Sequence, residues 1–579
     1  QKGQASVRSK QLATTTISNA IESDGSFNGV GFINLEKPDI FDITSAVLTS
    51  DSNVSVLDRF SLDNGQRDTH YGLGKLIKRS GRADPVGNVS VTFRHFTSTG
   101  SGDFFAVNSY TGTVEYDGGT QDVIADDYYN LEIDQSGVKS QAAGTMTVAG
   151  TMTVQSAATY ALDTRDISVT GTTTSPGTIR ISTGTYTAGG ATDFGNGTLS
   201  ITSTGTYDAN NSFAASSGNV TFTGAGFLKC NGQVTSFGTL SEDNGTVVFD
   251  KTSGTQNLNA DTYYNLEIDQ GATKASQGNL TIKNNLTITA GTFDIGTGND
   301  NLTIGGNFTN SSTFTTSGET VTFDGSTENT SSLISDATVD LIINKSGTGG
   351  ITFGGNSSFD NVTVTDGYLD IGPYTFTADN TISIDAAGTL KIPNNGTFNA
   401  DGQLTTHDDG EINFTGTGSQ GDLICSSTSA NTFGTLDAAA GTVTFDGSGS
   451  QAIPVETFFN LKNSNTNGLT MSGNVTVNGE LNLNVAADIT TGANTLTIGT
   501  GGSITNAADD RHINVDNTSG YLAKSTNSTS AFSFPVGNGT IVRPIRLTPS
   551  STSAETYTVR YNDNRYGDGS VTANFSNTG

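Results

Sequence analysis

Two phrases, GTIRISTGTYTA at residues 177–188 and GTLSITSTGTYDA at residues 197–209, decide the fold of this chain. They begin at Gly177 and Gly197, and a further strand-like phrase, GNVTF, begins at Gly218. The same pattern returns as GTLKIPNNGTFNA at residues 388–400, and the phrase GEINF follows it from Gly410. A nearly constant step of about 21 residues between such phrases is typical of proteins built from stacked coils.

Within each phrase, apolar side chains alternate with polar ones. This period of two, with β-branched residues and Gly or Asn between the phrases, indicates short strands rather than helices. A coil this short cannot bury its inner face alone and must stack on its neighbours. We therefore expect one continuous parallel β-helix over residues 112–505, with about 21 residues per coil. The side chains expected to point inward are Ile179, Ile181, Leu199, Ile201, Val220, Phe222, Leu390 and Ile392.

The composition fits a thin core shared by many coils. Only 33% of the residues are hydrophobic, 72 are Gly and none is Trp. Disorder would explain the polarity but not the regular spacing of the apolar residues. A series of β-sandwich modules would need domains of about 100 residues, which the short period disfavours. At about 4.8 Å per coil, roughly 400 residues would form about 19 coils and extend for about 90 Å.

The charge divides the chain into three parts. Of 27 basic and 56 acidic residues, positions 1–100 hold 11 and 10 and positions 505–579 hold 6 and 6. The middle therefore keeps 10 basic and 40 acidic groups, a net charge of −30. We place a small β-rich anchoring domain at residues 1–111, the β-helix at 112–505 and a β-sandwich-like module at 506–579. Such an acidic middle disfavours nucleic acid as a partner. It either keeps a large exposed surface soluble, which we favour, or binds Ca²⁺.

A longer repeat lies over the short one. Residues 226–269 and 418–463 share the phrase FGTL and a following GTV phrase ending in FD, at an offset of 196. Cys230 and Cys425 occupy matching places at an offset of 195, which puts them about 40 Å apart by the stacking estimate. They cannot form a disulfide at that distance, and we interpret them as small core residues.

We find no pattern typical of a catalytic, cofactor or structural metal site. His70, His95, His407 and His512 are too dispersed for a metal or triad motif. Paired carboxylates could serve a glycosidase, but in a chain this acidic we expect the pairs to be solvated turn residues. Aromatic pairs recur at one position of the repeat, which favours packing at a coil corner over ligand stacking. The acidic pairs are Asp126–Asp127, Asp408–Asp409 and Asp509–Asp510, and the aromatic pairs are Tyr128–Tyr129, Tyr263–Tyr264 and Phe458–Phe459.

The N-terminal part carries a distinctive series of phrases: LDRFSLDNGQRD at residues 57–68, KLIKRS at 75–80, DPVGNVSVTF at 84–93 and GDFFAVNSY at 102–110. Read alone, Asp63-Asn64-Gly65 predicts a turn, and Val89, Val91 and Phe93 alternate like a half-buried strand. In this order the phrases resemble a module of large structural proteins of tailed bacteriophages. That resemblance implies a role in a virion rather than an activity.

The solenoid and the C-terminal part resemble secreted surface repeat proteins of Bacteroidota. The resemblance rests on repeats of the GTVTFDGSGSQ type and on GYLAK at residues 520–524, FPVG at 534–537 and RPIRL at 543–547. A phage of such bacteria would reconcile the two ends of the chain. Because the chain begins at Gln1 rather than Met and ends without a clear terminal signal, we expect it to be part of a longer or processed protein, with the C-terminal module truncated.

These observations favour a non-enzymatic fibre or appendage of a phage tail, extracellular and located on the virion. We expect the basic residues Lys75, Lys78, Arg79 and Arg82 to form a docking surface for other tail or baseplate proteins, because this near-neutral domain differs in charge from the acidic middle. The far end could contact a host glycan or protein. No stretch is apolar enough for membrane insertion, and the sequence leaves a single chain and a homotrimer open. The alternatives are a bacterial cell-surface adhesin and a β-helix polysaccharide depolymerase.

Overall fold

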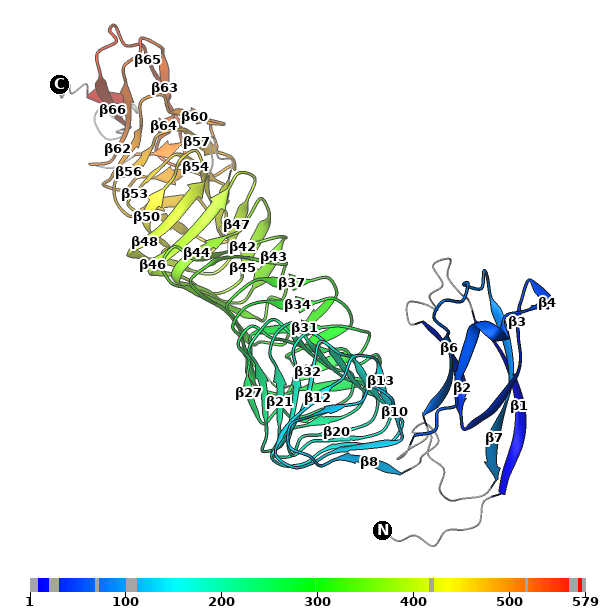
Figure 1. Ribbon diagram of the computed structural model, residues 1–579. Coiled ribbons are helices and arrows are strands. Elements are labelled where there is room, and N and C mark those ends of the chain that lie inside the picture. The colour runs from blue at the N-terminus through cyan, green and yellow to red at the C-terminus, as the bar shows by residue number, and fades with distance from the viewer. Residues whose placement is uncertain are drawn as a thin grey trace. The chain divides into compact units, whose positions relative to one another are not determined.

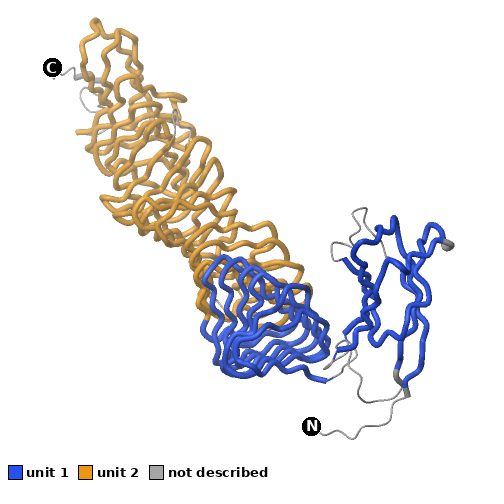
Figure 2. The backbone as a smooth tube through the Cα atoms, in the orientation of Figure 1, with its two compact units in different colours: residues 1–226, 235–239 blue, residues 227–234, 240–579 orange. Residues whose placement is uncertain are grey.

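The protein is described here from a computed structural model that covers residues 9–19, 31–67, 72–99, 112–296, 298, 300–415, 421–515, 519–561 and 571–574. The fold is a parallel β-solenoid of about 20 turns with about 21 residues per coil, plus antiparallel sheets at the N-terminus (Figure 1), which confirms the expected fold class. In the described part of the chain, the one helical element is a short 3-10 turn, η1 (Leu57–Arg59). The chain forms two compact units, residues 1–226 with 235–239 and residues 227–234 with 240–579 (Figure 2).

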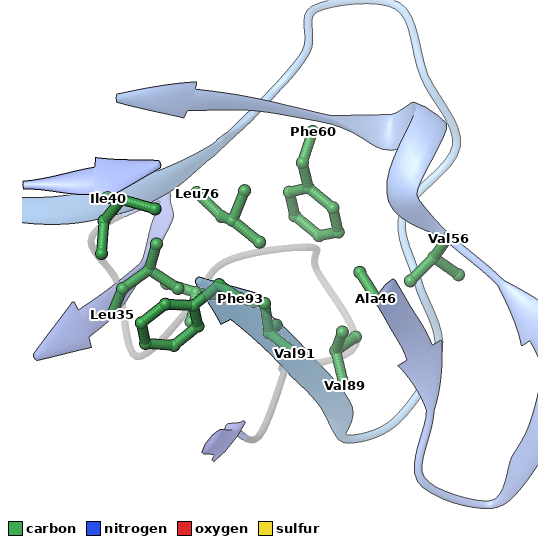
Figure 3. Packing of buried hydrophobic residues seen from close by; sticks show 10 residues of the cluster. Leu35, Ile40, Ala46, Val56, Phe60, Leu76, Val89, Val91 and Phe93 are labelled. Carbon is green, nitrogen blue, oxygen red and sulfur yellow. The ribbon is translucent and has the colours of Figure 1, made fainter. Parts of the chain in front are cut away.

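The N-terminal domain consists of two antiparallel sheets, with strand orders β1-β7-β3-β4 and β2-β6-β5. Their strands are β1 (Ser9–Asn19), β2 (Phe32–Pro38), β3 (Ile40–Leu48), β4 (Asp51–Ser55), β5 (Phe60–Asp63), β6 (Leu73–Lys78) and β7 (Val89–Thr99). Side chains from both sheets meet in one buried cluster (Figure 3). Val89, Val91 and Phe93 of β7 are fully buried in it, as their alternation predicted. Each such buried side chain contributes about 1.5–3 kcal/mol to stability.

The solenoid coils of the first unit each contribute one strand to each of three parallel sheets. Ile179 lies opposite Leu199 and Ile181 opposite Ile201 in the parallel register, which reproduces the step between the two phrases of the sequence. All eight side chains expected to point inward, here and in the second unit, are at most 2% exposed. Two consecutive coils consist of β17 (Thr173–Thr174), β18 (Thr178–Ile181) and β19 (Thr185–Ala188), then β20 (Thr192–Asp193), β21 (Thr198–Ile201) and β22 (Thr206–Ala209).

In the second unit some strands continue round a corner of the coil, so that one strand pairs with two strands of the preceding coil. β44 (Val362–Asp370), β46 (Ile382–Pro393) and β48 (Leu404–Thr415) pair in parallel along most of their length. On the neighbouring face the rings of Phe359, Phe376 and Phe398 stack with centroid separations of 5.3 and 5.4 Å. Such columns of identical side chains fill the core with little sequence variety, because each coil offers the next the same surface.

Asparagine side chains join successive coils at a turn. The Asn265 Oδ1 accepts a hydrogen bond from the backbone N–H of Asn285, the Asn285 Oδ1 from that of Asn307, and the Asn307 Oδ1 from that of Thr330, at 3.3, 2.9 and 2.9 Å. The N–H groups of Asn285 and Asn307 lie just before a strand begins, and that of Thr330 lies in the short strand β40 (Glu328–Ser331); each needs an acceptor. The side chain of the preceding coil supplies it.

Parallel pairing continues past residue 505. β62 (Tyr521–Thr526) pairs in parallel with β59 (Thr495–Ile498), and β64 (Val536–Gly537) pairs in the same way with β61 (Ile513–Asn514). The other edge of β62 is antiparallel, with the added strands β66 (Glu555–Tyr561) and β67 (Val571–Asn574). A separate antiparallel pair consists of β63 (Phe532–Phe534) and β65 (Ile545–Leu547). The domain limit near residue 505 stays a prediction, and sheet pairing crosses it.

Candidate docking surface

The outer face of the sheet β2-β6-β5 combines a cation with apolar groups. Lys75 and Ile77 lie on the same face of β6, because alternate residues of a strand point the same way. The Lys75 Nζ lies 4.3 Å from the centre of the Phe32 ring, in a cation–π contact. Phe32 pairs with Ile77, which is 41% exposed, and the exposed Arg79 follows directly after the strand. We call Phe32, Lys75, Ile77 and Arg79 the basic face.

The other two expected docking cations do not belong to this face. Lys78 forms an ion pair with Asp84, and the Arg82 Nη1 lies 3.3 Å from the Asp58 Oδ2. The Arg59 Nη1 also donates to the Asp84 carbonyl oxygen at 3.0 Å. These contacts fix the loop after β6, and they offset two of the four positive charges. The structure therefore brings Lys75 and Arg79 to the basic face, whereas Lys78, the last residue of β6, and Arg82 hold the loop that follows this strand.

The opposite sheet carries an exposed patch that the sequence analysis missed. Phe41 is 52% exposed and Leu12 is 45% exposed, and the Phe41 and Phe96 rings meet edge to face with centroids 5.6 Å apart. The Lys10 Nζ lies 5.0 Å from the Phe96 ring centre. Arg94 binds the Asp42 carboxylate through two nitrogens, and these hydrogen bonds lower the pKa of Asp42. We call Leu12, Phe41 and Phe96 the aromatic face; Leu12 lies opposite Phe96 in the β1–β7 register, and the register of β3 on β7 shifts next to Phe41. No local sequence pattern marks this face, because it depends on the pairing of the three strands.

The phrase LDNGQRD, which is part of the phage resemblance, mostly serves internal structure. Gly65 has a φ of +81°, and a Cβ there would lie 2.1 Å from the Gly72 carbonyl oxygen, so this turn requires glycine. Arg67 binds Asp63 at 2.7 Å and thereby lowers the pKa of that carboxyl group. Gln66 Nε2 donates to the Asp39 Oδ1 at 2.7 Å. Asp68, His70, Tyr71 and the phrase at residues 102–110 lie outside the described residues.

The three described histidines lie apart from one another, and the acidic pairs are exposed. His95 is buried in the N-terminal domain, where its Nε2 lies 3.0 Å from the Thr15 Oγ1. His407 is exposed, whereas His512 is buried with its Nδ1 3.0 Å from the Asp488 Oδ1. All six residues of the acidic pairs are exposed. Asp126, Asp509 and Asp510 lie in a bend or turn as expected, but the expectation was wrong for the other three: Asp127 belongs to β10 (Asp127–Tyr128), and Asp408 and Asp409 lie within β48. Among the described residues, no three His, Cys, Asp or Glu side chains gather in a way that could hold a metal ion.

The cysteines are core residues, and the aromatic pairs split between core and surface. Cys230 and Cys425 are buried free thiols, which confirms that interpretation. The first member of each aromatic pair is buried, namely Tyr128, Tyr263 and Phe458. The prediction of packing was wrong for the second members: Tyr129 is 44% and Phe459 36% exposed, and Tyr264 is partly exposed. Successive residues of a strand point to opposite faces, so only one of two neighbours can enter the core.

Comparisons with protein-family models, curated proteins and solved structures gave no match for this chain. In the part of the chain that the structure describes, no helix is long and apolar enough to cross a membrane.

Proposed function

We propose that this protein is a non-enzymatic structural fibre or appendage of a tailed phage virion. In this proposal the N-terminal domain docks to another tail or baseplate protein, and the solenoid carries the remaining chain outward to the extracellular side. The supporting observation is the contrast between two parts of one chain, the solenoid and the small N-terminal domain. An acidic parallel solenoid gains about 4.8 Å with each coil, while the small antiparallel domain keeps two exposed apolar faces bearing cations.

The charges favour the N-terminal domain as the attachment point. The middle region carries a net charge of −30, so copies of it repel each other laterally, which favours separate fibres. The near-neutral domain offers the basic face and the aromatic face, each of which combines apolar contact area with cations. Exposed apolar patches of this kind mark protein contacts, and complementary charge gives such contacts speed and specificity.

Attachment can be tested by removing the domain. Phage particles that encode this chain without residues 1–110 should assemble but should not carry the solenoid. Antibodies against the solenoid measure its presence on the particles. The purified truncated chain should keep its β-sheet circular dichroism spectrum. Particles that still carry the truncated chain would contradict the proposal, as would attachment through residues 506–579.

A narrower variant tests which face docks. Lys75→Glu combined with Arg79→Glu reverses the charge of the basic face without touching the Lys78–Asp84 and Arg82–Asp58 pairs. We expect it to reduce incorporation into particles at least about tenfold, since like charges across an interface cost several kcal/mol. Lys229→Glu in the solenoid is the matched control and should incorporate normally.

The alternatives predict other results. A bacterial adhesin would be found on the surface of uninfected cells, and a depolymerase would release new reducing or unsaturated ends from host polysaccharides. We expect neither, and either outcome would replace the fibre proposal.

A further inference from the structure

One face of the solenoid loses its regular pairing between two coils of the second unit. β35 (Thr292–Asp294) and β38 (Thr313–Thr315) pair in parallel, and β38 is the last strand of its four-stranded sheet. On the next coil no strand takes its place, and Ser335 alone forms an isolated bridge to Ser358. A hollow of about 370 Å³ opens between these two segments.

The ladder geometry shows which backbone groups face this hollow. The Thr313 N–H donates to the Gly291 carbonyl and the Thr315 carbonyl accepts from the Ile295 N–H, so both residues are turned toward the coil of β35. In a strand, neighbouring residues direct their N–H and C=O groups to opposite sides. The N–H and C=O of Phe314 therefore point away from β35 and toward the hollow.

The facing wall of the hollow contains Ile334, Ser335 and Asp336. The Ile334 carbonyl accepts from the Ser358 N–H, and the Asp336 N–H donates to the Ser358 carbonyl. Ser335 between them directs its N–H and C=O the other way, into the hollow. Among the described residues no backbone hydrogen bond joins Phe314 to Ser335. Two donors and two acceptors thus converge from opposite walls.

The Phe314 ring adds an apolar surface to these groups. It stacks on the buried Phe293 ring at 5.6 Å, and no ring of the following coil covers its other side in the contacts of the described residues. In the regular part of the solenoid, Phe376 is stacked between Phe359 and Phe398. Leu333 at the rim of the hollow is 52% exposed.

Both ends of the hollow are closed at ordinary coil spacing. The Ser332 N–H donates to the Phe308 carbonyl at 2.8 Å on one side, and Thr316 bonds the Asp336 carboxylate on the other. An extended peptide strand cannot run through a slot closed in this way. A compact ligand that enters from solvent can fit into the hollow. The volume of the hollow lies within the usual range of small-molecule sites, about 300–1,000 Å³.

We propose that this hollow binds a single pyranose unit of a glycan. One face of a pyranose presents C–H groups that pack on an aromatic ring, and its hydroxyl groups both donate and accept hydrogen bonds. Those hydroxyls can accept from the N–H groups of Phe314 and Ser335 and donate to their carbonyl groups. The inference does not depend on attachment through the N-terminal domain, because a failed docking test would leave this site unchanged.

The test uses the full chain and a panel of methyl glycopyranosides at millimolar concentration, observed by saturation-transfer NMR and by hydrogen exchange of the peptides that contain Phe314 and Ser335. Without sugar, these two amides should exchange rapidly, and a bound pyranoside should slow them. Phe314→Leu should weaken binding about tenfold, as expected for losing one ring contact. Phe376→Leu makes the same change where both ring faces are covered, and it should bind like the wild type.

Three results would overturn the proposal. The first is slow exchange of Phe314 and Ser335 in the free protein, which would mean that the groups are already paired. The second is no binding by any sugar of the panel. The third is undiminished binding by Phe314→Leu, which would place the sugar elsewhere on the chain.

Discussion

The duplicated segments, residues 226–269 and 418–463, share their buried hydrogen bonds but differ in the strand that stacks on them, β32 (Thr273–Ser276) in the first and β55 (Leu469–Met471) in the second. We call each segment together with this strand copy 1 (residues 226–276) and copy 2 (residues 418–471). In each, a buried glutamine caps the turn after a cysteine strand. The Gln256 Nε2 donates to the carbonyls of Cys230 and Gly232 at 2.6 Å, and the Gln451 Nε2 donates to those of Cys425 and Ser427 at 2.7 and 2.8 Å. The two glutamines are separated by the same offset in the sequence as the two cysteines, so the duplication extends to the hydrogen bonds of the interior.

The copies differ at the position stacked on this glutamine. Lys274 lies opposite Gln256, and Leu469 lies opposite Gln451. The Lys274 ammonium group is buried, and its three N–H groups face four carbonyl oxygens, those of Asp269, Gln270, Ala272 and Lys251. In copy 2 the loop residue Asn465 donates to the Gln451 Oε1 at 2.8 Å and to the Gly449 carbonyl at 2.7 Å. The carbonyl groups of such a turn can therefore receive their hydrogen bonds from a buried cation or from a neutral amide. Of these two donors, only the cation titrates, so only it makes the stability of the coil depend on pH.

The buried thiols make this comparison measurable. Burial raises the pKa of Cys425, and Cys230 is equally inaccessible. A thiol reagent therefore reacts only when the surrounding coil opens, and the labelling rate reports the local stability of each copy. Single-cysteine variants separate the signals.

The largest effect should come from the buried aromatic residue of each copy. Tyr263→Ala and Phe458→Ala remove a fully buried ring and should cost about 3–5 kcal/mol of local stability. Thiol labelling should accelerate at Cys230 for the first variant and at Cys425 for the second. Tyr264→Ala and Phe459→Ala, at the neighbouring outward positions, should change stability by less than about 0.5 kcal/mol. Equal effects at the two positions would contradict the split between core and surface.

Removing the buried glutamines should have the next largest effect. Gln256→Leu and Gln451→Leu each withdraw two hydrogen bonds from backbone carbonyls, and we expect a cost of about 2–4 kcal/mol. The loss should be greater for Gln451→Leu, because Asn465 also loses its acceptor. The exposed Gln403, which donates to the Ala430 carbonyl at 2.8 Å, provides the control Gln403→Leu, with little expected change. Denaturant-dependent labelling of both thiols measures the difference, and a cost in one copy alone would break the equivalence.

A pH difference between the copies should be the smallest effect. Burial lowers the pKa of Lys274 to about 8, although Asp269 and Asp250 oppose the shift. Between pH 8 and the ordinary lysine pKa near 10.4, the unfolded copy 1 binds more protons than the folded one, so its stability rises with pH. Below pH 8 both states are protonated and the slope vanishes. Over this window copy 1 should gain about 2 kcal/mol relative to copy 2.

The ratio of labelling rates at Cys230 and Cys425 measures this gain, because the intrinsic reactivity of the two thiols cancels. Lys274→Met should remove the pH dependence, though it destabilises copy 1 by leaving carbonyl groups without their donor. A ratio that stays constant from pH 8 to pH 10 would show that the ammonium group remains charged throughout.

Local patterns were sufficient to predict the solenoid, but not the two exposed faces of the N-terminal domain. Ile179 and Leu199 revealed the coil because strand alternation and turn residues are both properties of short segments. The pairing of Arg82 with Asp58, and that of Lys78 with Asp84, depends on how the antiparallel domain folds, so charge clustering alone overestimated the basic face. The aromatic face requires knowing that β1, β3 and β7 are neighbours. The hollow at Phe314 arises where residues 332–339 fail to supply a strand, an irregularity that periodicity cannot locate.

The asparagine link between coils bears on how such a protein changes over generations. Asn285 donates its own backbone N–H to the Asn265 Oδ1 and offers its Oδ1 to the N–H of Asn307, so donor and acceptor recur together once per coil. A duplication or deletion of one whole repeat therefore leaves no broken contact on either side. The chain can lengthen or shorten in steps of about 4.8 Å, so the length of the solenoid becomes a trait on which selection can act without altering the N-terminal domain.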